Sequence, residues 1–509
     1  MMGWPRERVA LAFADQEYTY GRLDELAGGY AAALAARGVK PGDRVALMGS
    51  NRPEWVAAVL GTWRAGAAVA LFSPSWKQAE AEHAVALVRP AHGIGDHPVL
   101  PGLLPVLGFD EPPPQASPAT APHPSPAQHT EAVLVFSSGT TGLPKAVRHT
   151  HGAFAAAIAH WRDCLELTSG DRLQVTTPPS HILGILNIAT CLELGIWMRL
   201  HPRFDLDRVL QCVQDDRITV EMAVAPIALA MANHPRLESY DLSSLRFIMW
   251  GATPVTASVA QTVTRRTGVP WVPAYGASEN PVITCNPVHG ARLDSVGKAV
   301  PGVDLRVVSL QTGAVLPAGE TGEIQLQSPS LMVGYLPEEE TALSMDDGWY
   351  RTGDVGYIEP DGWVHLTDRS KEMIKVRGFQ VAPAEVEGVL LGHSCVVDAA
   401  VFGVPDELSG ESIIAAVVFD ASTALDAGTA LDASTALDPG AAGPAEELIT
   451  YVAERLASYK KPSQVLIVDA IPRLPSGKAL RRVLRERCLK EHWLKESFLK
   501  EDDGRATVG

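Results

Sequence analysis

Residues 137–151 read SSGTTGLPKAVRHTH, and the first nine of them hold two Ser, two Thr, two Gly and one Lys. Glycine removes the Cβ barrier to unusual backbone angles, so consecutive backbone N–H groups can turn toward a bound anion. The preceding residues EAVLVF (131–136) predict a short buried strand, and the following residues GAFAAAIA (152–159) predict the start of a helix. A strand, a hydroxyl-rich glycine loop and a lysine are typical of a phosphate-binding site.

The loop differs from the P-loop of many nucleotide-binding proteins, whose pattern is GxxxxGK[ST]. Here Gly142 is followed by Leu143, Pro144 and Lys145, and Ala146 stands where that pattern needs a hydroxyl. An ordinary surface turn can have the same composition. These residues alone therefore leave two interpretations open, a phosphate cradle and a turn.

Composition indicates a globular protein of several domains. The 509 residues exceed one compact core and suggest roughly two to four domains. An apolar share of 46% with 20% charged residues is that of a folded chain. The 43 basic and 59 acidic residues give a net charge of −16, so we expect no general attraction to nucleic acid or to an anionic membrane. Any phosphate must be held by local geometry.

The cysteines and the apolar segments indicate in which cellular compartment the protein is expected. The six Cys are scattered without a CxxC pair, which argues against a zinc site or a disulfide framework and fits a reducing cytosol. The first residues, MMGWPRERVALAFADQE, lack the apolar core of a signal peptide. The apolar run Ala57–Phe72 is interrupted by Arg64 and is too short to cross a bilayer. We therefore expect a cytoplasmic protein without a membrane span.

The pattern of predicted helices and strands changes along the chain. Residues 17–95 and 171–300 alternate helical and strand-like segments, which favours a mainly parallel sheet covered by helices. Residues 111–128 are rich in Pro and Ala and predict an extended loop. Short strands fill 301–370, with a hairpin predicted about residues 360–362, and a small α+β segment follows.

That last segment contains a tandem repeat. Residues 421–438 consist of the hexamers ASTALD, AGTALD and ASTALD. Three hexamers are too short for a solenoid. We interpret the low-complexity stretch 420–444 as an expanded surface loop without a catalytic role.

Four further stretches are compatible with a nucleotide site. They are WGATP (250–254), YGASE (275–279), YRTGD (350–354) with DR (368–369), and LPSGKALR (474–481). Each alone has a simpler interpretation, such as a glycine turn or a solvated lysine. Together with the loop at 137–145, in this order and spacing, they resemble the adenylate-forming (AMP-binding) superfamily. That superfamily includes acyl-CoA synthetases, 4-coumarate–CoA ligases, fatty acyl-AMP ligases, luciferases and peptide-synthetase adenylation domains, and the resemblance extends from about Tyr18 to Arg487.

The resemblance implies a fold and a division into domains. We expect an α/β protein whose large, multi-lobed N-terminal domain (1–368) combines parallel βα sheets with a distorted β-barrel. This domain would hold the nucleotide and acyl sites. A small, mobile α+β C-terminal domain (369–509) is expected to act as a lid that carries the catalytic lysine.

The family's roles for phosphate and metal transfer to this chain residue by residue. The loop would contact the β- and γ-phosphates of ATP through hydroxyl and N–H donors. Glu279 and Thr140 would help to hold Mg²⁺, which proteins bind through a carboxylate together with substrate phosphates. Ser278 stands where the family has Thr and would contact the α-phosphate. The loop residues assigned to ATP are Ser137, Ser138, Gly139, Thr140, Thr141, Gly142 and Lys145.

By the same resemblance, the adenosine would lie among the other motifs. Tyr275 would stack on the adenine, and Arg369 would support the ribose and the phosphate. Asp354 suits the two ribose hydroxyls, because a carboxylate only accepts hydrogen bonds and has two oxygens. The residues assigned to the adenosine are Gly251, Ala252, Thr253, Tyr275, Gly276, Asp354 and Arg369.

The small domain would supply the remaining groups. Lys478 is the candidate adenylation lysine, which would reach the carboxylate oxygen and the α-phosphate. Lys371 occupies the hinge position. Lys375 and Gln380 fall where coumarate-ligase-type members have active-site polar groups. Arg377 replaces their usual Lys, which keeps the charge but changes its hydrogen-bond geometry.

These assignments imply a reaction in two halves. The carboxylate would first attack MgATP to give acyl-AMP and pyrophosphate, with Lys478 and Mg²⁺ stabilising the accumulating charge. The small domain would then rotate about Lys371 and admit a thiol, which attacks the mixed anhydride and releases AMP. His181, in PPSHILG (178–184), matches a family segment beside the acyl carboxylate, although a His among apolar residues can be purely structural.

The sequence leaves the acid and the thiol open. The residues expected to wall the acyl pocket are Ile182, Gly184, Ile227, Ala277 and Pro281. Because no Arg, Lys or Asp falls among them, we expect a fatty or other apolar acid, or an aryl-alkenyl acid, rather than an amino acid. The acceptor is CoA or the phosphopantetheine of an acyl carrier protein. For the 3′-phosphate of CoA the sequence offers Arg377 and Lys460-Lys461, and it does not indicate an oligomeric state.

A protein of another class could share these motifs. A nucleotide-binding pseudoenzyme would bind ATP without catalysing adenylation. Such a protein would have lost Lys478, Glu279 or Asp354, and all three are present. We therefore favour an enzyme.

Overall fold

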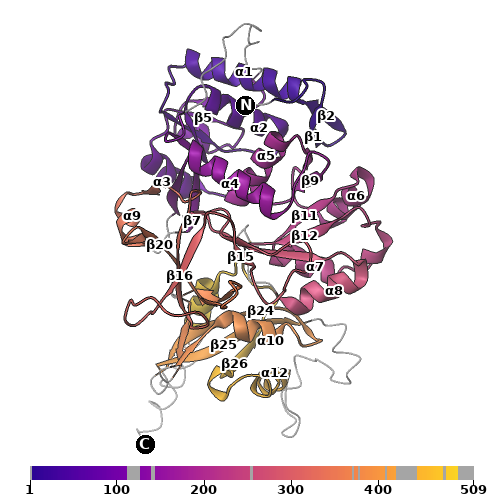
Figure 1. The fold of residues 1–509 in the computed structure, drawn as a ribbon, viewed down its shortest axis with the longest axis vertical. Coiled ribbons are helices and arrows are strands. Elements are labelled where there is room, and N and C mark those ends of the chain that lie inside the picture. The colour runs from indigo at the N-terminus through magenta and orange to yellow at the C-terminus, as the bar shows by residue number, and fades with distance from the viewer. Residues whose placement is uncertain are drawn as a thin grey trace, which may run out of the picture.

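A computed structural model describes residues 3–111, 127–138, 144–252, 256–369, 372–376, 379–406, 410–419, 444–473 and 477–490. The chain runs broadly from the indigo N-terminal part at the top of Figure 1 to the orange and yellow C-terminal unit at the bottom. Two large sheets, a smaller antiparallel sheet and the sheet of the C-terminal unit make up the β-structure of these residues. The fold class expected from the sequence, α/β, is confirmed.

The first large sheet has seven strands in the order β18-β8-β7-β4-β3-β5-β6. Its interior strands are parallel, whereas β8 and β18 add antiparallel strands at one edge. The strands are β3 (Arg44–Leu47), β4 (Ala68–Leu71), β5 (His92–Ile94), β6 (Val106–Leu107), β7 (Glu131–Ser138), β8 (Pro144–Thr150) and β18 (Gly334–Leu336).

The second large sheet has nine strands in the order β15-β14-β13-β12-β11-β9-β10-β1-β2. Its six central strands, β13 to β1 in that order, are parallel, and the outer strands are antiparallel. The strands are β1 (Val9–Phe13), β2 (Gln16–Thr19), β9 (Arg172–Val175), β10 (Trp197–Leu200), β11 (Val220–Ala223), β12 (Phe247–Trp250), β13 (Trp271–Tyr275), β14 (Thr284–Cys285) and β15 (Lys298–Ala299).

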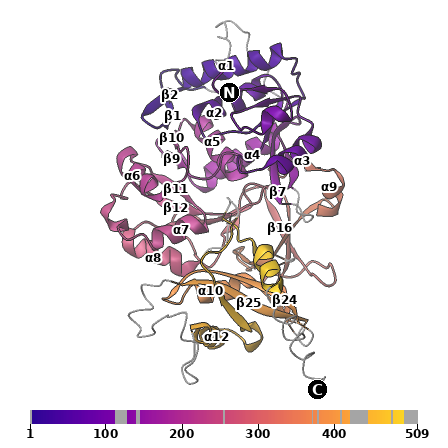
Figure 2. The same ribbon diagram turned by 180° about the vertical axis from the view of Figure 1, so that it is seen from behind.

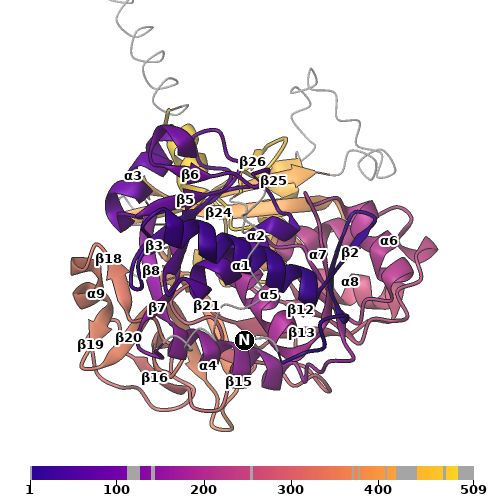
Figure 3. The same ribbon diagram turned by 90° about the horizontal axis from the view of Figure 1, so that it is seen from above.

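Helices form a layer between the two sheets and cover their outer faces (Figures 2 and 3). One core joins apolar residues of both sheets with those of α1 (Tyr20–Ala36), α2 (Pro53–Arg64), α4 (His151–Cys164) and α5 (Ile182–Leu194). The outer face of the seven-stranded sheet packs on α3 (Gln78–Val88). The outer face of the nine-stranded sheet packs on α6 (Leu206–Asp216), α7 (Ala225–Ala232) and α8 (Ala257–Thr267).

The third sheet is antiparallel and resembles a half-barrel, where the sequence predicted a distorted barrel. It consists of β16 (Asp304–Val308), β17 (Gly322–Gln327), β19 (Met345–Asp346), β20 (Trp349–Ile358) and β21 (Val364–Arg369), and the short helix α9 (Glu339–Ser344) precedes β19. Strands β20 and β21 pair as the hairpin predicted about residues 360–362.

The C-terminal unit is a five-stranded sheet with helices on both faces. Its strands are β22 (Ile374–Val376), β23 (Phe379–Val381), β24 (Val396–Asp406), β25 (Gly410–Phe419) and β26 (Gln464–Ile467). Helices α10 (Pro383–Leu390) and α12 (Pro444–Ala453) contribute to the core on one face, and the helix over 481–490 packs on the other. The α+β character predicted for this part is confirmed, whereas the exact domain boundary stays a prediction.

The opening stretch differs from its prediction in one respect. The strand and the helix on its two sides are present, but the second half of the quoted segment is itself a strand, β8, paired antiparallel with β7. Ala146, Val147 and His149 are buried there, and β8 lies between β7 and β18 in the sheet, so this half is not an open loop. The Pro- and Ala-rich residues 112–126 and the hexamers at 421–438 lie outside the described residues. Within the described part of the chain, no helix combines the length and apolarity that a bilayer crossing needs.

A buried polar network lies inside the nine-stranded sheet. Glu221 of β11 is 2% exposed, and Gln174 of β9 donates from Nε2 to its Oε2 at 2.6 Å. Thr176 Oγ1 lies 3.2 Å from Glu221 Oε1 and donates to the carbonyl of Met222 at 2.9 Å. Burial raises the pKa of Glu221 to about 8, and it lowers the pKa of His201, whose Nε2 is 2.7 Å from Gln174 Oε1, to about 4. Both groups are therefore neutral over most of the range near pH 7.

This network predicts a pH-dependent stability. Between its unfolded pKa of 4.5 and its folded pKa of about 8, Glu221 is ionised when unfolded but protonated when folded, so the free energy of unfolding falls as the pH rises. Glu221→Gln keeps a neutral donor and acceptor in place. We expect the variant to match the wild type near pH 4.5 and to exceed its free energy of unfolding by a few kcal/mol at pH 8. Urea midpoints from pH 4.5 to 8 measure this, with Glu7→Gln at an exposed position as the control; a constant difference across the range would contradict it.

Candidate active site

Motifs far apart in the sequence meet around the carboxylate of Glu279. This side chain is 8% exposed and follows β13, whereas Ser137 lies near the end of β7. Glu279 Oε1 accepts hydrogen bonds from Ser137 Oγ at 3.3 Å and from the hydroxyl of Tyr335 at 2.8 Å. Both motifs lie at the carboxyl ends of parallel strands, where α/β sheets usually bind their ligands. The loop and the YGASE motif thus share one site.

The YRTGD motif joins the same group through Tyr275. The Tyr275 hydroxyl donates to Asp354 Oδ2 at 2.5 Å, and the two residues are 8% and 7% exposed. Asp354 on β20 is paired across the hairpin with Arg369 on β21. A carboxylate accepts hydrogen bonds at about four lone-pair positions, and the bond from Tyr275 occupies one of them.

A histidine that the sequence did not flag supports the YGASE turn. His149 on β8 is fully buried, and its Nε2 lies 2.7 Å from the carbonyl of Ser278. Burial lowers the pKa of His149 to about 4, so the ring is neutral and donates this bond. A Cβ on Gly276 would lie 2.1 Å from the Pro281 carbonyl, so this turn requires glycine there. The hydroxyl of Ser278 stays a predicted contact to the α-phosphate.

Lys145 has partners that composition did not indicate. Its Nζ lies 3.7 Å from the centre of the Tyr335 ring and 3.6 Å from Glu340 Oε2 on α9. The side chain is 19% exposed. The loop lysine therefore rests on a tyrosine whose hydroxyl is bound to Glu279.

His181 begins the helix that the sequence placed beside the acyl carboxylate. It is the N-cap of α5, and its Nδ1 accepts a hydrogen bond from the backbone N–H of Leu183 at 3.3 Å. Burial lowers the pKa of His181 to about 4, so the imidazole is neutral near pH 7. A Cβ on Gly184 would lie 2.1 Å from the Pro178 carbonyl. The loop before α5 therefore packs tightly against the helix at this glycine. The structure gives His181 a capping role, and its contact with substrate stays a prediction.

The residues expected to line the acyl pocket come from three elements. Ile182 and Gly184 belong to α5, Ile227 belongs to α7, and Ala277 and Pro281 lie in the turn after β13. Ile182 and Ile227 are 5% and 6% exposed. Their assignment to one pocket stays a prediction.

The backbone predicted to border the adenine follows β12. The N–H of Gly251 donates to the Ala223 carbonyl at 3.3 Å, which ties this segment to β11. Ala252 adopts a left-handed φ of 63°, which is uncommon for a residue with a Cβ. Such strain is often found at functional sites.

The loop that carries Lys478 reaches the N-terminal part of the molecule. Gly477 has a φ of +86°, and a Cβ there would lie 2.7 Å from Cδ of Pro226 at the start of α7. Lys478 Nζ forms an ion pair with Glu372 Oε1 at 2.7 Å. Arg481 also pairs with Glu372, and with Glu387 at 2.9 Å. The candidate catalytic lysine is thus held by the carboxylate that follows the hinge position.

Two basic residues proposed from the sequence have neighbours that the sequence did not indicate. Lys375 lines a cavity of about 480 Å³ between β22 and the third sheet, together with Glu323, Asp346 and Arg351. Lys460 pairs with Glu385 at 2.6 Å, whereas Lys461 is exposed. Their roles at the active site and at CoA stay predictions.

Several assignments fall on parts of the chain that are not described. They concern Gly139, Thr140, Thr141, Gly142, Thr253, Lys371 and Arg377, and the side chains of Ser138, Arg369 and Gln380. Their roles stay predictions.

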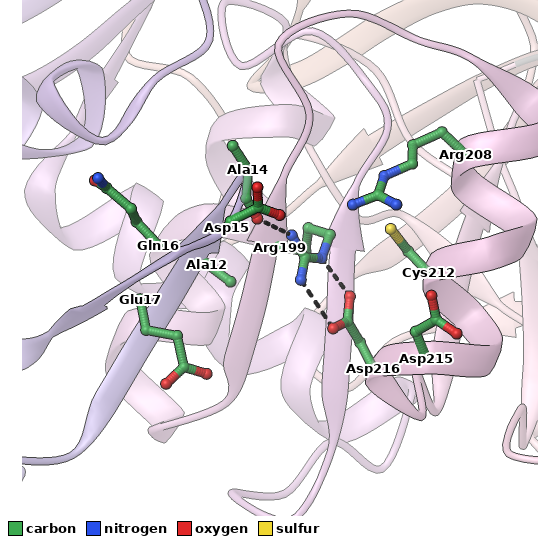
Figure 4. A pocket seen from close by; sticks show the side chains of 10 residues that line it. All are labelled: Ala12, Ala14, Asp15, Gln16, Glu17, Arg199, Arg208, Cys212, Asp215 and Asp216. Atoms are coloured by element: carbon green, nitrogen blue, oxygen red, sulfur yellow. Dashed lines mark hydrogen bonds and ion pairs between the residues drawn. The ribbon is translucent and has the colours of Figure 1, made fainter.

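A second cavity is unrelated to these motifs (Figure 4). It measures about 270 Å³ and is lined by the β1–β2 turn, β10 and α6. Arg199 crosses it to donate to Asp216 Oδ1 at 2.8 Å and to the Ala14 carbonyl at 3.0 Å. None of the predicted site residues lines it, so it does not compete as the active site.

Sequence reasoning missed the residues that connect the motifs. These are His149, Tyr335, Glu340 and Glu372. Each touches its partner across more than fifty residues, and no local spacing indicates the pairing. Glu372 had the best available signal, since it follows the hinge position directly.

Comparison with known proteins agrees with this geometry. A family profile described as AMP-binding enzyme matches residues 2–336, and a profile described as AMP-binding enzyme C-terminal domain matches residues 385–478. The 4-coumarate–CoA ligase-like 9 protein of Oryza sativa subsp. japonica is 36% identical over 519 residues, which cover 94% of this chain and 90% of the relative.

Solved structures add two similar folds. ATP-bound MatB from Rhodopseudomonas palustris has a TM-score of 0.85 at 29% identity and covers 96% of this chain and 97% of its own. The o-succinylbenzoate CoA synthetase MenE of Bacillus subtilis, in complex with its acyl-adenylate intermediate, has a TM-score of 0.81 at 28% identity. That similarity covers 94% of this chain and 95% of the other.

Proposed function

This chain belongs to the AMP-binding enzyme family, and we propose that it activates an apolar carboxylic acid with ATP and transfers the acyl group to CoA. It is an AMP-forming acid–thiol ligase, and the proposal concerns its substrates and the roles of its residues. The observation that carries it is that three of the motifs meet in two hydrogen-bonded pairs, Ser137 with Glu279 and Tyr275 with Asp354. These four residues come from three motifs and offer the donors and acceptors that a nucleotide needs.

ATP would be bound along this group. Asp354 accepts hydrogen bonds from the ribose hydroxyls, since a carboxylate only accepts and has two oxygens. Ser137 and Lys145 donate to the phosphates, and the neutral His149 keeps the YGASE turn in place. The acid lies beside the N-cap of α5. His181 is neutral there, so it adds no charge next to the carboxylate of the acid.

Mg²⁺ fits the donors that this site offers. Glu279 is a buried carboxylate, and its Oε1 is already fixed by two hydroxyl donors. One such carboxylate together with substrate phosphates is how proteins usually hold Mg²⁺. When bound, the ion would neutralise charge on the phosphates and thereby favour attack by an anion.

The first half-reaction joins the acid to AMP. A carboxylate oxygen attacks the α-phosphorus, the bond from that phosphorus to the bridging oxygen breaks, and pyrophosphate leaves. Lys478, once released from Glu372, supplies a cation to the α-phosphate and to the attacking oxygen. The contact of Gly477 with Pro226 supports an arrangement in which the C-terminal unit faces the N-terminal site.

The second half-reaction needs a thiol at the acyl carbon. The sulfur attacks the mixed anhydride, the bond from the acyl carbon to the phosphate oxygen breaks, and AMP leaves with both electrons of that bond. We favour CoA because the relatives with similar sequence and fold are named CoA ligases or synthetases. The alternative acceptor, a carrier-protein phosphopantetheine, presents the same thiol.

We infer an apolar or aryl-alkenyl acid from the expected walls of the pocket. Ile182 and Ile227 are apolar and buried, and Gly184, Ala277 and Pro281 have no polar side chain. A second charged end of the acid would find no partner among them. The 4-coumarate–CoA ligase-like relative supports an aryl group within this class.

A panel of acids tests the proposal. Pyrophosphate release is measured with 4-coumarate, decanoate, malonate and phenylalanine in the presence of ATP, and the product is identified by mass spectrometry with CoA or with a holo-carrier protein. We expect the apolar acids to exceed malonate and phenylalanine at least about tenfold in kcat/KM, because an unpaired buried charge costs more than 1.4 kcal/mol. If the acyl group is transferred only to the carrier protein, the acceptor is the phosphopantetheine of that protein and not CoA. ATP binding without acid-dependent pyrophosphate release would refute an enzyme.

A further inference from the structure

We propose that Tyr335 is a positioning residue that holds the loop lysine and the metal-binding carboxylate apart and ready for MgATP. This inference rests on the proposed roles of Lys145 and Glu279. It assigns a function to a residue that none of the five sequence motifs includes. Tyr335 lies on the edge strand β18, which pairs with β8, the strand that contains Lys145.

The Tyr335 hydroxyl has a defined direction. The residue is 1% exposed, and its hydroxyl lies 2.8 Å from Glu279 Oε1 and 3.1 Å from the hydroxyl of Tyr350. An ionised carboxylate can only accept, so Tyr335 donates its single proton to Glu279. The Tyr335 oxygen therefore accepts from Tyr350. This orientation fixes one oxygen of Glu279, which Ser137 also contacts, and it limits the rotation of the carboxylate.

The Tyr335 ring holds a charge of the opposite sign. Lys145 Nζ lies 3.7 Å from the ring centre, within the range of a cation–π contact, and Glu340 lies 3.6 Å away on α9. One rigid side chain thus contacts the ammonium through its face and the carboxylate through its hydroxyl. No direct ion pair joins Lys145 to Glu279 in the described part of the chain.

This separation has a chemical consequence. A lysine and a carboxylate that are partly buried attract each other strongly, because the local dielectric is low. If they paired directly, neither charge would be available, since the lysine is needed by phosphate and the carboxylate by Mg²⁺. An aromatic spacer with a hydroxyl satisfies both groups weakly enough that the nucleotide can replace those contacts. Glu340 offers the lysine a partner that lies away from the metal position.

Metal binding and nucleotide kinetics together test this role. Tyr335→Phe removes only the hydroxyl, and Tyr350→Phe is the matched control, since it leaves the bond from Tyr335 to Glu279 in place. Binding of Mn²⁺ to the full-length protein with α,β-methylene-ATP is followed by electron paramagnetic resonance. We expect Tyr335→Phe to weaken the binding of Mn²⁺ about tenfold. The Mg²⁺ concentration that gives half-maximal pyrophosphate exchange should rise by the same factor, and the KM for the acid should stay unchanged.

Tyr335→Leu and Glu340→Gln test the ring of Tyr335 and its lysine contact separately from the hydroxyl. Glu279→Gln tests the metal role on which the inference rests. Tyr335→Leu also removes the ring and is expected to raise the KM for ATP beyond the effect of Tyr335→Phe, whereas Glu340→Gln should change the KM for ATP without changing Mn²⁺ affinity. Wild-type Mn²⁺ affinity in Tyr335→Phe, with a lower kcat at every Mg²⁺ concentration, would overturn the inference. Wild-type Mn²⁺ affinity in Glu279→Gln would instead overturn the proposed metal role of Glu279. A loss in Glu279→Gln without a loss in Tyr335→Phe refutes the inference alone.

Discussion

Replacing Lys478 with Ala is expected to slow acyl-AMP formation about 10²- to 10³-fold while leaving thiol transfer from supplied acyl-AMP within about twofold of wild type. Loss of one preorganised donor at a site of developing negative charge typically has a kinetic effect of this size. Thiol attack on the mixed anhydride occurs after the small domain has turned, when the lysine is no longer at the phosphate. Rapid-quench measurement of pyrophosphate release and of acyl-CoA formation separates the two halves.

Two control variants belong to the same unit. Lys461→Ala removes another exposed ammonium of the C-terminal unit and should leave acyl-AMP formation near wild type. Glu372→Gln removes the carboxylate that holds Lys478 at 2.7 Å and tests whether this pair limits access of the lysine to the nucleotide. Equal losses of both half-reactions in Lys478→Ala would refute the division of labour. In that case Lys478 would act through the folding or docking of its loop against Pro226.

Local signals in the sequence were sufficient for the elements of the fold. Apolar spacing predicted the alternation of helices and strands in residues 17–95, where the structure has α1 and β3, and turn residues predicted the hairpin of β20 and β21. The strand β8 was missed because the hydroxyl and glycine residues before it suggested that the loop continued, whereas burial of Ala146, Val147 and His149 in the sheet decided its conformation. Tertiary pairing with β7 and β18 thus outweighed local composition.

Only those residues of the candidate site that belong to a sequence motif could be predicted. Tyr275, Glu279 and Asp354 stand in recognisable patterns. The structure joins Tyr275 to Asp354 by a hydrogen bond and Glu279 to Tyr335 by another. Tyr335 contacts Glu279 across 56 residues, and Lys478 contacts Glu372 across more than a hundred. Such pairings depend on register and packing, for which one sequence contains no direct signal. The sequence therefore indicated the residues expected to bind the nucleotide but not the residues that contact and hold them.

Replacing Asp354 with Ala is expected to weaken ATP binding by about two orders of magnitude or more. Each hydrogen bond to a charged group contributes roughly 1.5–3 kcal/mol, and the proposal assigns two such bonds to the ribose. The same change removes the acceptor at Asp354 to which the Tyr275 hydroxyl donates at 2.5 Å. Tyr275→Phe removes that internal bond while keeping the carboxylate, so it measures this contribution separately. Equilibrium dialysis with ATP reports both variants.

Deoxynucleotides identify which contacts the carboxylate makes. If Asp354 binds the ribose, 2′-deoxy-ATP and 3′-deoxy-ATP should bind the wild type about tenfold or more weakly than ATP, and this preference should disappear in Asp354→Ala. Tyr275→Phe should retain the preference, since its carboxylate is intact. If Asp354→Ala still discriminated between ATP and its deoxy forms as the wild type does, the carboxylate would serve only to hold Tyr275. The ribose would then be recognised by another group, and the hydrogen-bonded pair of Tyr275 and Asp354 would be a structural link between β13 and β20.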